Sequence, residues 1–388
     1  MKNSIKNGLF IFVFTILMLN FAFFNNTINF ANAKNINEKL TSAKAMAVME
    51  VKSGRLLYSK NEDEKLPMAS TTKIITAIVA IENNYDLNKI VEIEKDCTGI
   101  EGTSIYLKEG EHLTIEELLY GLMLRSGNDS AVAIAKATCG SVESFVKLAN
   151  EFCIRVGAVN THLTNPHGLP DDNHYTTAKD LAIISSYAMQ NEKFAKIVGT
   201  KQKTIANELS KGGKRILNNK NKLLKNMENA TGIKTGYTKK AGRCFVGSAK
   251  KDDMEVVCVL LNCVPMFEDC QSLIEKAFNE YKLVEVVKSD EVIGETKVLG
   301  GEKENIKLTC KIGAMLPLKV SEIDTIETVY DIPSFIQSPH DKNNPVGKFD
   351  IYVSKNLIFS GKIYIIESVE SKKQNVSESI IKDFVHLL

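Results

Sequence analysis

The sequence predicts an α/β fold of the α+β type, followed by a second domain that is all β. Three observations lead to this prediction. Alternating apolar strands lie near both ends of residues 34–283. Helical periodicity dominates between them, and from residue 284 to residue 370 strands prevail, separated by glycines and prolines. We therefore expect one antiparallel sheet flanked by helices, with an inserted helical block, and then a C-terminal β domain.

The beginning of the first domain reads as a hairpin and then helices. Two alternating segments between Ala43 and Tyr58 surround a turn at 52–54. A helix is expected from Ser70, because isoleucines recur there at helical spacing. Thr114 and Glu117 match a capping box and so predict a helix from 115 to about 125. Further helices are expected at about 129–138, at about 142–156, and after the loop 165–175.

The end of the first domain returns to strands. The alternation predicts strands at 201–206, 232–237, 244–249 and 254–261, with a polar, lysine-rich loop at 207–222. A helical period then covers residues 268–281. The sheet is thus expected to be made from both ends of this domain.

The two chain ends indicate export and contact with a membrane surface. Residues 1–33 carry two lysines, an apolar run and the triplet Ala31-Asn32-Ala33, which is typical of a cleaved signal peptide. An uncleaved anchor helix is the alternative. In the tail, 371–388, apolar residues at helical spacing predict an amphipathic helix, which either lies on a membrane or docks on the β domain. The protein is expected outside the cytoplasm.

The composition argues against several kinds of partner. Lys and Arg total 49 against 47 acidic residues, so no excess of positive charge is available for nucleic acid. The eight cysteines are scattered and are interpreted as buried small hydrophobes. No cysteine or histidine pattern has metal-ligand spacing, and we expect neither metal nor cofactor.

The segment "MASTTKIITA" places Ser70 and Lys73 three residues apart at the expected start of a helix. Residues at this spacing share one helix face, so the lysine amine can reach the serine hydroxyl. Burial and nearby positive charge would lower the pKa of Lys73 and allow it to accept the proton of Ser70. The pair is therefore a candidate nucleophile and base.

Two further motifs make the constellation specific. "RSGND" puts Ser126 and Asn128 in a tight link between two expected helices, and "GIKTGY" puts Lys234, Thr235 and Gly236 on an expected strand. A second lysine would help to keep the first one neutral and would attract a carboxylate. Ser126 could pass the proton on to a leaving amine. Gly236 would leave room for a substrate backbone.

These motifs identify a family. "STTK", "SGN" and "KTG" resemble the three motifs of the penicillin-binding proteins and serine β-lactamases, and "NPHGL", "HYTTAKDLA" and "GIKTGYTKKAGRCFV" resemble the low-molecular-weight D-alanyl-D-alanine carboxypeptidases. The resemblance is strong over about 43–281 and weaker over the β domain. It implies a serine-type carboxypeptidase that removes the terminal D-alanine of peptidoglycan stem pentapeptides and is a target of β-lactam antibiotics.

The resemblance also implies roles for individual residues. Ser70 would be acylated, Lys73 would be its base, and Ser126 would relay the proton. Asn128 would hold the substrate amide, and the N–H groups of Ser70 and Tyr237 would form the oxyanion hole.

The remaining roles concern the carboxylate and the neighbouring loop. Lys234 and Thr235 would bind the terminal carboxylate, assisted by either Lys220 or Lys222, a choice that the sequence leaves open. His167 and Asp180 would shape the loop beside the site.

Three rival readings remain open. A class A-like β-lactamase would share the fold, but residues 152–191 contain no glutamate to serve as its deacylating base. A noncatalytic cell-wall binding protein would not need all three motifs intact. A zinc hydrolase would need a histidine pattern that the six histidines do not form.

Overall fold

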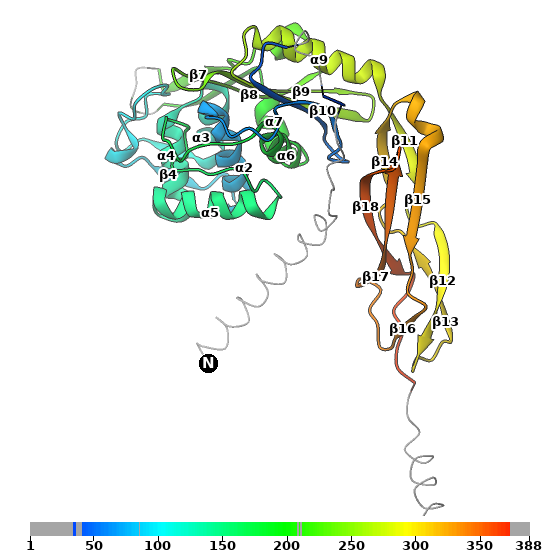
Figure 1. Ribbon diagram of the computed structural model, residues 1–388. Coiled ribbons are helices and arrows are strands. Elements are labelled where there is room, and N and C mark those ends of the chain that lie inside the picture. Colours follow the sequence, from blue (N-terminus) through cyan, green and yellow to red (C-terminus); the bar gives the residue numbers. More distant parts are fainter. Residues whose placement is uncertain (1–33, 36–40, 85, 208, 210–211, 373–388) are drawn as a thin grey trace, which may run out of the picture. The chain divides into compact units, whose positions relative to one another are not determined.

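The described chain forms two compact units (Figure 1). The structure is a computed structural model that describes residues 34–35, 41–84, 86–207, 209 and 212–372. The boundary between the units lies between Lys282 and Leu283. The expected signal peptide and the expected amphipathic tail, beyond residue 372, lie outside the described residues.

The first unit is built on a six-stranded sheet with the order β1-β3-β2-β10-β9-β8. Its N-terminal part is β1 (Lys34–Asn35), β2 (Ala45–Glu50) and β3 (Leu56–Lys60), and its C-terminal part is β8 (Ala230–Thr238), β9 (Gly242–Lys251) and β10 (Met254–Leu261). β2 pairs antiparallel with β10, with Val48 opposite Cys258. The prediction that both ends of the domain share one sheet is therefore confirmed.

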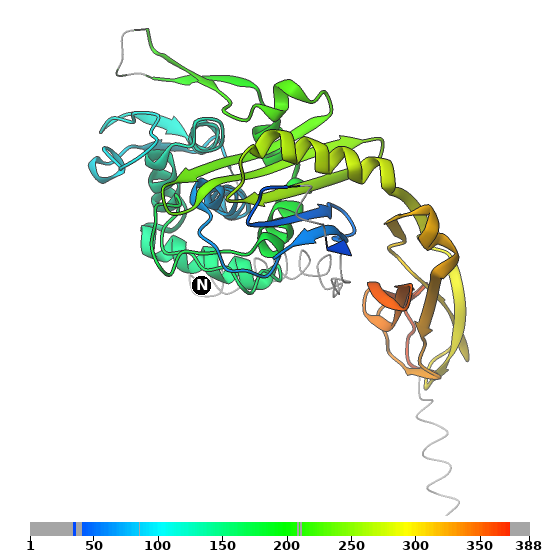
Figure 2. The same cartoon turned by 45° about the horizontal axis from the view of Figure 1, so that its top comes forward.

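Helices cover the two faces of this sheet. α9 (Met266–Glu280) packs against β9 and β10, whereas α6 (Ala178–Met189) packs against β2 and β10 and α7 (Glu192–Gly199) packs against β8. Figure 2 shows α9 lying across the sheet, on the side away from the helical block. The apolar strands are buried because both faces are covered.

The inserted block contains α2 (Lys73–Asn83), α3 (Ile115–Tyr120), α4 (Asn128–Cys139) and α5 (Val142–Arg155). Thr114 and Glu117 form the predicted capping box, and Gly140 ends α4 with φ 79°. Two small strands, β4 (Ile90–Glu92) and β5 (His112–Thr114), pair beside α3. The sequence signals for helix ends were correct because they are local.

Two segments differ from the sequence-based expectation. The expected helix from Ser70 begins as a 3₁₀ turn, η2 (Ala69–Thr72), and the α-helix starts at Lys73. The expected loop at 207–222 contains β7 (Lys214–Asn218), which pairs with β6 (Gln202–Ala206), and the short helix α8 (Leu223–Asn226) follows it. In β7 only Leu217 is fully buried, so the alternation was too weak to detect among the lysines.

The second unit is all β, as predicted. One sheet has the order β15-β17-β18-β13-β12-β16, and β11 pairs with β14. Its buried core includes Leu308, Leu316, Phe349, Ile351 and Ile363. The strands are β11 (Lys282–Val287), β12 (Val292–Leu299), β13 (Asn305–Thr309), β14 (Ala314–Leu318), β15 (Ile326–Asp331), β16 (Phe335–Gln337), β17 (Pro345–Val353) and β18 (Asn356–Ile365), with a 3₁₀ turn, η5 (Val320–Thr325).

Two further results concern the burial of the cysteines and the search for helices that could span a membrane. All eight cysteines are free thiols, and all but Cys139 are buried, which agrees with their interpretation as small core residues. No helix within the described ranges has the length and the apolar character needed to cross a bilayer.

Candidate active site

Ser70 lies in η2, where the chain passes from a strained residue into α2. Ala69 has φ +49°, and the hydroxyls of Thr71 and Thr72 donate to the carbonyls of Met68 and Ala69 at 2.6 and 2.7 Å. These bonds hold the turn that carries Ser70. Ser70 itself is only half-buried, so its hydroxyl remains accessible to a substrate.

Lys73 is completely buried and points its amine at three oxygens. Its Nζ lies 3.0 Å from Ser70 Oγ, 2.7 Å from Asn128 Oδ1 and 2.6 Å from the carbonyl oxygen of His167. A neutral amine has two N–H donors and one lone pair. Asn128 and His167 offer only acceptors to Nζ, so they take the two N–H groups, and the lone pair is left for the Ser70 hydroxyl.

The electrostatics favour this neutral form. Burial lowers the pKa of Lys73 well below its usual value, the positive charge of Lys234 lowers it further, and Asp129 partly opposes the change. Lys220 adds a smaller effect in the same direction as Lys234. An uncharged Lys73 can accept a proton from Ser70 over the 3.0 Å that separates them.

The "SGN" link follows a π-helical turn, η4 (Gly121–Arg125). Ser126 then adopts a left-handed conformation with φ 66° and is 5% exposed. Asn128, at the first turn of α4, donates through Nδ2 to the carbonyl of Glu101 at 2.5 Å while its Oδ1 faces Lys73. π turns and left-handed non-glycine residues are concentrated at functional sites.

Asp129 organises the loop that borders Asn128. The buried carboxylate accepts hydrogen bonds from the Ser104 hydroxyl and from the N–H groups of Ile105, Leu107 and Ser130, the last three at 2.9–3.1 Å. The same loop places Gly102 so close that a Cβ there would lie 2.8 Å from Asn128 Nδ2. The position of Asn128 thus depends on this loop.

The "KTG" motif lies on β8, which packs against η2. Lys234 is 2% exposed, and its Nζ donates to the carbonyl of Thr235 at 2.9 Å. A Cβ on Gly236 would lie 3.1 Å from the backbone nitrogen of Ser70, so glycine allows β8 to approach the turn. Tyr237 follows and is exposed, with the Arg243 guanidinium over its ring.

Lys220 and Lys222 differ in their effect on the two buried lysines. The pKa of Lys234 is lowered to about 7, mainly by burial and then by the positive charge of Lys220. Lys220 and Lys222 are both exposed, but the backbone N–H of Lys220 donates to the carbonyl of Leu124 at 3.1 Å, which anchors it next to the "SGN" link. The positive charge of Lys222 is not among the causes that lower the pKa of Lys73 or Lys234.

The loop 165–175 supplies the third wall around Lys73. Asn165 Oδ1 accepts the N–H groups of His167 and Gly168 at 3.3 and 2.7 Å and so turns the His167 carbonyl toward Lys73. Gly168 has φ +91°, and a Cβ there would lie 2.0 Å from the carbonyl oxygen of Ala69. Only glycine fits this position.

Two buried side chains support the loop from behind. His174 Nδ1 accepts the N–H of Thr164 at 3.1 Å, so its Nε2 carries the proton and donates to Thr72 Oγ1 at 2.8 Å. Asp180 accepts from the N–H of Asn160 at 2.6 Å and from the Thr161 hydroxyl at 2.9 Å. Asp180 therefore holds the base of the loop rather than lining the site.

The structure brings the three sequence motifs together, and it adds residues that the sequence analysis did not single out. The additional residues are Asp129, Asn165, Gly168 and His174. Their only signals were an Asn-Pro-His-Gly turn, the segment "HYTTAKDLA" that begins at His174, and a polar residue directly after "SGN". No group of three or more potential metal ligands occurs in the described part of the chain.

The fold and this site together define a serine-type peptidase of the low-molecular-weight penicillin-binding protein class. Comparisons with known proteins agree. The family model of D-alanyl-D-alanine carboxypeptidases, peptidase S11, matches residues 32–264, and the model of the penicillin-binding protein 5 C-terminal domain matches residues 281–371. The chain belongs to the D-alanyl-D-alanine carboxypeptidase family.

Individual relatives extend over most of the chain. D-alanyl-D-alanine carboxypeptidase DacF of Bacillus subtilis is 31% identical over 325 residues, which cover 81% of this chain and 83% of DacF. The crystal structure of penicillin binding protein 5 from Haemophilus influenzae superposes with TM-score 0.73 at 25% identity and covers 85% of this chain and 98% of that one. The Streptomyces K15 DD-transpeptidase is 30% identical, with TM-score 0.59, and covers 62% of this chain and 98% of its own.

Proposed function

We propose that this enzyme cleaves the terminal D-alanine from peptidoglycan stem pentapeptides through an acyl-enzyme on Ser70. The observation that supports this most directly is the position of the Lys73 amine. It is buried, its pKa is lowered, and it lies 3.0 Å from the Ser70 hydroxyl with its two N–H groups taken by Asn128 and His167. Such an amine can accept the serine proton as the bond to the substrate forms.

The first half-reaction uses the motif residues in order. Ser70 Oγ attacks the carbonyl carbon of the penultimate D-alanine, and its proton moves to Lys73 Nζ. The N–H groups of Ser70 and Tyr237 stabilise the oxyanion. When the intermediate collapses, the peptide C–N bond breaks, and Ser126 passes a proton from Lys73 to the nitrogen of the departing D-alanine.

The second half-reaction restores the enzyme. Water attacks the ester on Ser70, loses a proton to the same lysine, and releases the shortened peptide as Ser70 recovers its proton. The loop atom that faces Lys73 is the main-chain carbonyl of His167 rather than a glutamate carboxylate. A β-lactam acyl-enzyme is therefore expected to persist, since it lacks the base that a class A-like β-lactamase would supply.

Substrate recognition depends on the cationic side of the site. Lys234 and Thr235, with Lys220 beside them, bind the terminal carboxylate, and Asn128 binds the peptide amide. A substrate carboxylate would compensate the charge of the buried Lys234 ammonium. A charge-assisted hydrogen bond of this kind is strong when it is shielded from water. The substrate is assembled into the wall outside the membrane, and so the enzyme acts there after export by residues 1–33.

The test is to incubate the purified protein with a stem pentapeptide and to weigh the products. We expect loss of one D-alanine, and Ser70→Ala should abolish both this cleavage and the benzylpenicilloyl adduct at residue 70. A noncatalytic wall-binding protein would give no cleavage, and activity lost to a chelator would indicate a metal hydrolase. Rapid turnover of a chromogenic cephalosporin would favour the β-lactamase instead.

The likeness to the Streptomyces K15 DD-transpeptidase makes a second reaction worth measuring. In that reaction an amine, rather than water, attacks the ester on Ser70. Adding a D-amino acid as acceptor to the same incubation separates the two. A product that is heavier than the tetrapeptide by the residue mass of the added D-amino acid would show transfer. If the acceptor leaves the amount of tetrapeptide unchanged, the enzyme carries out hydrolysis alone.

A further inference from the structure

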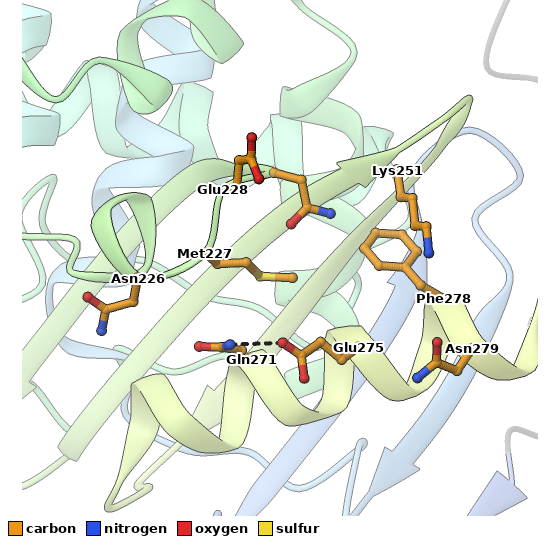
Figure 3. A pocket seen from close by; sticks show the side chains of 9 residues that line it. Asn226, Met227, Glu228, Lys251, Gln271, Glu275, Phe278 and Asn279 are labelled. Carbon is orange, nitrogen blue, oxygen red and sulfur yellow. Dashed lines mark hydrogen bonds between the residues drawn. The ribbon is translucent and has the colours of Figure 1, made fainter.

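Two of the buried cysteines lie against each other between α9 and the catalytic sheet. Cys258 is in β10 and Cys270 is near the start of α9, and both side chains are completely buried. Helix α9 packs on β9 and β10. Figure 3 shows α9 against the strands, with Gln271, Glu275 and Asn279 along the side of the helix that borders an open hollow. Cys270 belongs instead to the buried face of this helix.

The register of the sheet determines how close the two thiols are. Cys258 pairs with Gly247 of β9, so side chains at these two positions would lie on the same face of the sheet, with Cβ atoms about 4.5–5.5 Å apart. A Cβ on Gly247 would lie 2.5 Å from Cys270 Sγ. The sulfur of Cys270 thus occupies the space that a side chain opposite Cys258 would fill. In keeping with this position, the two thiols share a side-chain hydrogen bond.

This arrangement suits a disulfide. A disulfide needs two Cβ atoms about 3.5–4.5 Å apart, with side chains that point toward each other. Thiols that are already in hydrogen-bond contact reach this geometry by rotation about their Cα–Cβ bonds and a small adjustment of the helix. Gly247 leaves the room for that rotation, because it places no side chain between the helix and the sheet.

Cys263 lies between the two cysteines along the chain and is the nearest competitor. Its Sγ lies 3.2 Å from Asp269 Oδ2 and 3.5 Å from Ser42 Oγ, so its hydrogen bonds are made to these oxygens. The other cysteines, all of which lie in the described ranges, have no cysteine among the groups that act on their thiols. The pair in β10 and α9 is therefore the one that folding prepares for a bond.

We propose that Cys258 and Cys270 are oxidised to a disulfide that fastens α9 to the catalytic sheet. Each thiol gives up its hydrogen as one S–S bond forms, and the two protons and two electrons pass to an exchangeable external disulfide, which becomes two thiols. The bond forms while the chain folds. In the folded protein burial raises the pKa of Cys258 well above its usual value, so the reactive thiolate is scarce. The export proposed above places folding in a compartment where disulfides persist.

The bond would strengthen the end of the first unit. Helix α9 ends at Glu280, and the boundary to the second unit follows Lys282. A pull on the second unit therefore reaches the first unit through α9. A covalent link at Cys270 transfers that pull to β10, an interior strand of the sheet. Closing the loop 258–270 also stabilises the folded state relative to the unfolded chain.

The test is to refold the reduced, full-length protein in a glutathione redox buffer and, in parallel, in dithiothreitol. Remaining thiols are alkylated with iodoacetamide under denaturing conditions and counted by intact mass spectrometry. We expect two fewer labels after oxidation than the eight of the reduced protein, and an unreduced digest should contain a fragment that joins Cys258 to Cys270. Cys258→Ala should take up equal numbers of labels in both buffers. The matched control is Cys153→Ala, which removes an equally buried cysteine of α5 and should still lose two labels on oxidation.

Unfolding gives a second readout. Oxidation should raise the urea midpoint of the wild type and of Cys153→Ala, but not that of Cys258→Ala. The proposal is overturned if the wild type keeps all its thiols in the glutathione buffer, if the digest joins a different pair, or if Cys258→Ala also loses two labels. The joined fragment is read from the wild type, so the result stands even where a variant fails to fold. Because the readout is a count of thiols rather than release of D-alanine, it is independent of the proposed function.

Discussion

Replacing Lys220 by glutamine should shift the pH dependence of cleavage to higher pH. Lys220 lies beside the buried pair Lys73 and Lys234, and its positive charge lowers the pKa of both. Lys222, two residues further on, is exposed like Lys220, but it is not among the charges that lower the pKa of either lysine. Lys222→Gln is therefore the matched control, because it removes the same charge from the same segment.

The size of the shift follows from the pKa of Lys234, which falls from 10.5 to about 7. Burial is the larger cause and Lys220 the smaller one, so Lys220 accounts for less than half of the fall. Its removal should raise the pKa of Lys234 by about one, which corresponds to about 1.4 kcal/mol. The pKa of Lys73 should also rise, but by less, because Lys220 is the weakest of the causes that act on that pKa.

The assay is kcat/KM for a stem pentapeptide between pH 5 and 10, because this ratio reports the pKa values of the free enzyme. Lys73 must be neutral, so activity rises with pH through its pKa. Lys234 must be cationic to bind the carboxylate, so activity falls again above about pH 7. In Lys220→Gln the falling limb should move up by about one pH unit.

Lys220→Gln should also lower the maximum about tenfold, because one charge next to the carboxylate is lost. When kcat/KM is expressed as a fraction of each protein's own maximum, its value at pH 9 should be about ten times higher in the variant than in the wild type. The reasoning is refuted if the normalised profiles of Lys220→Gln and wild type superimpose. It is equally refuted if Lys222→Gln shifts the profile by as much.

Three further predictions concern the supports of the site. Asp129→Ala should lower the free energy of unfolding by about 3–5 kcal/mol in urea titrations, because buried N–H groups of the 104–107 loop lose their acceptor. Gly168→Ala should slow penicillin acylation of Ser70 at least tenfold in stopped-flow measurements, since its Cβ would meet the Ala69 carbonyl and displace the loop. The pKa of His174 is lowered to about 4, mainly by burial, so the unfolded chain takes up its proton first. The contribution of His174 to the free energy of unfolding should be fully present above about pH 6.5 and should fall by about 3 kcal/mol toward pH 4. In thermal melts, His174→Gln should therefore show a weaker dependence of stability on pH. Unchanged stability in Asp129→Ala, unchanged acylation in Gly168→Ala, or an unchanged pH slope in His174→Gln would contradict the corresponding argument.

The sequence by itself determined those features that depend on neighbouring residues in the chain. The capping box of Thr114 and Glu117, the stop at Gly140 and the spacing of Ser70 and Lys73 are local patterns, and the structure has each of them. The three motifs also indicated the family, because their residue types and order are specific even when their spatial arrangement is unknown.

Only the tertiary structure decided how the pKa of the Lys73 amine is lowered. Its burial, its distance to Asn128 and the approach of the His167 carbonyl join segments that lie 55 and 94 residues away along the chain. The effect of Lys220 rather than Lys222 on Lys234 has the same origin, since a Coulomb interaction depends on the distance between two charges and not on residue type. A pKa is set by everything that surrounds a group, and folding is what brings those surroundings together.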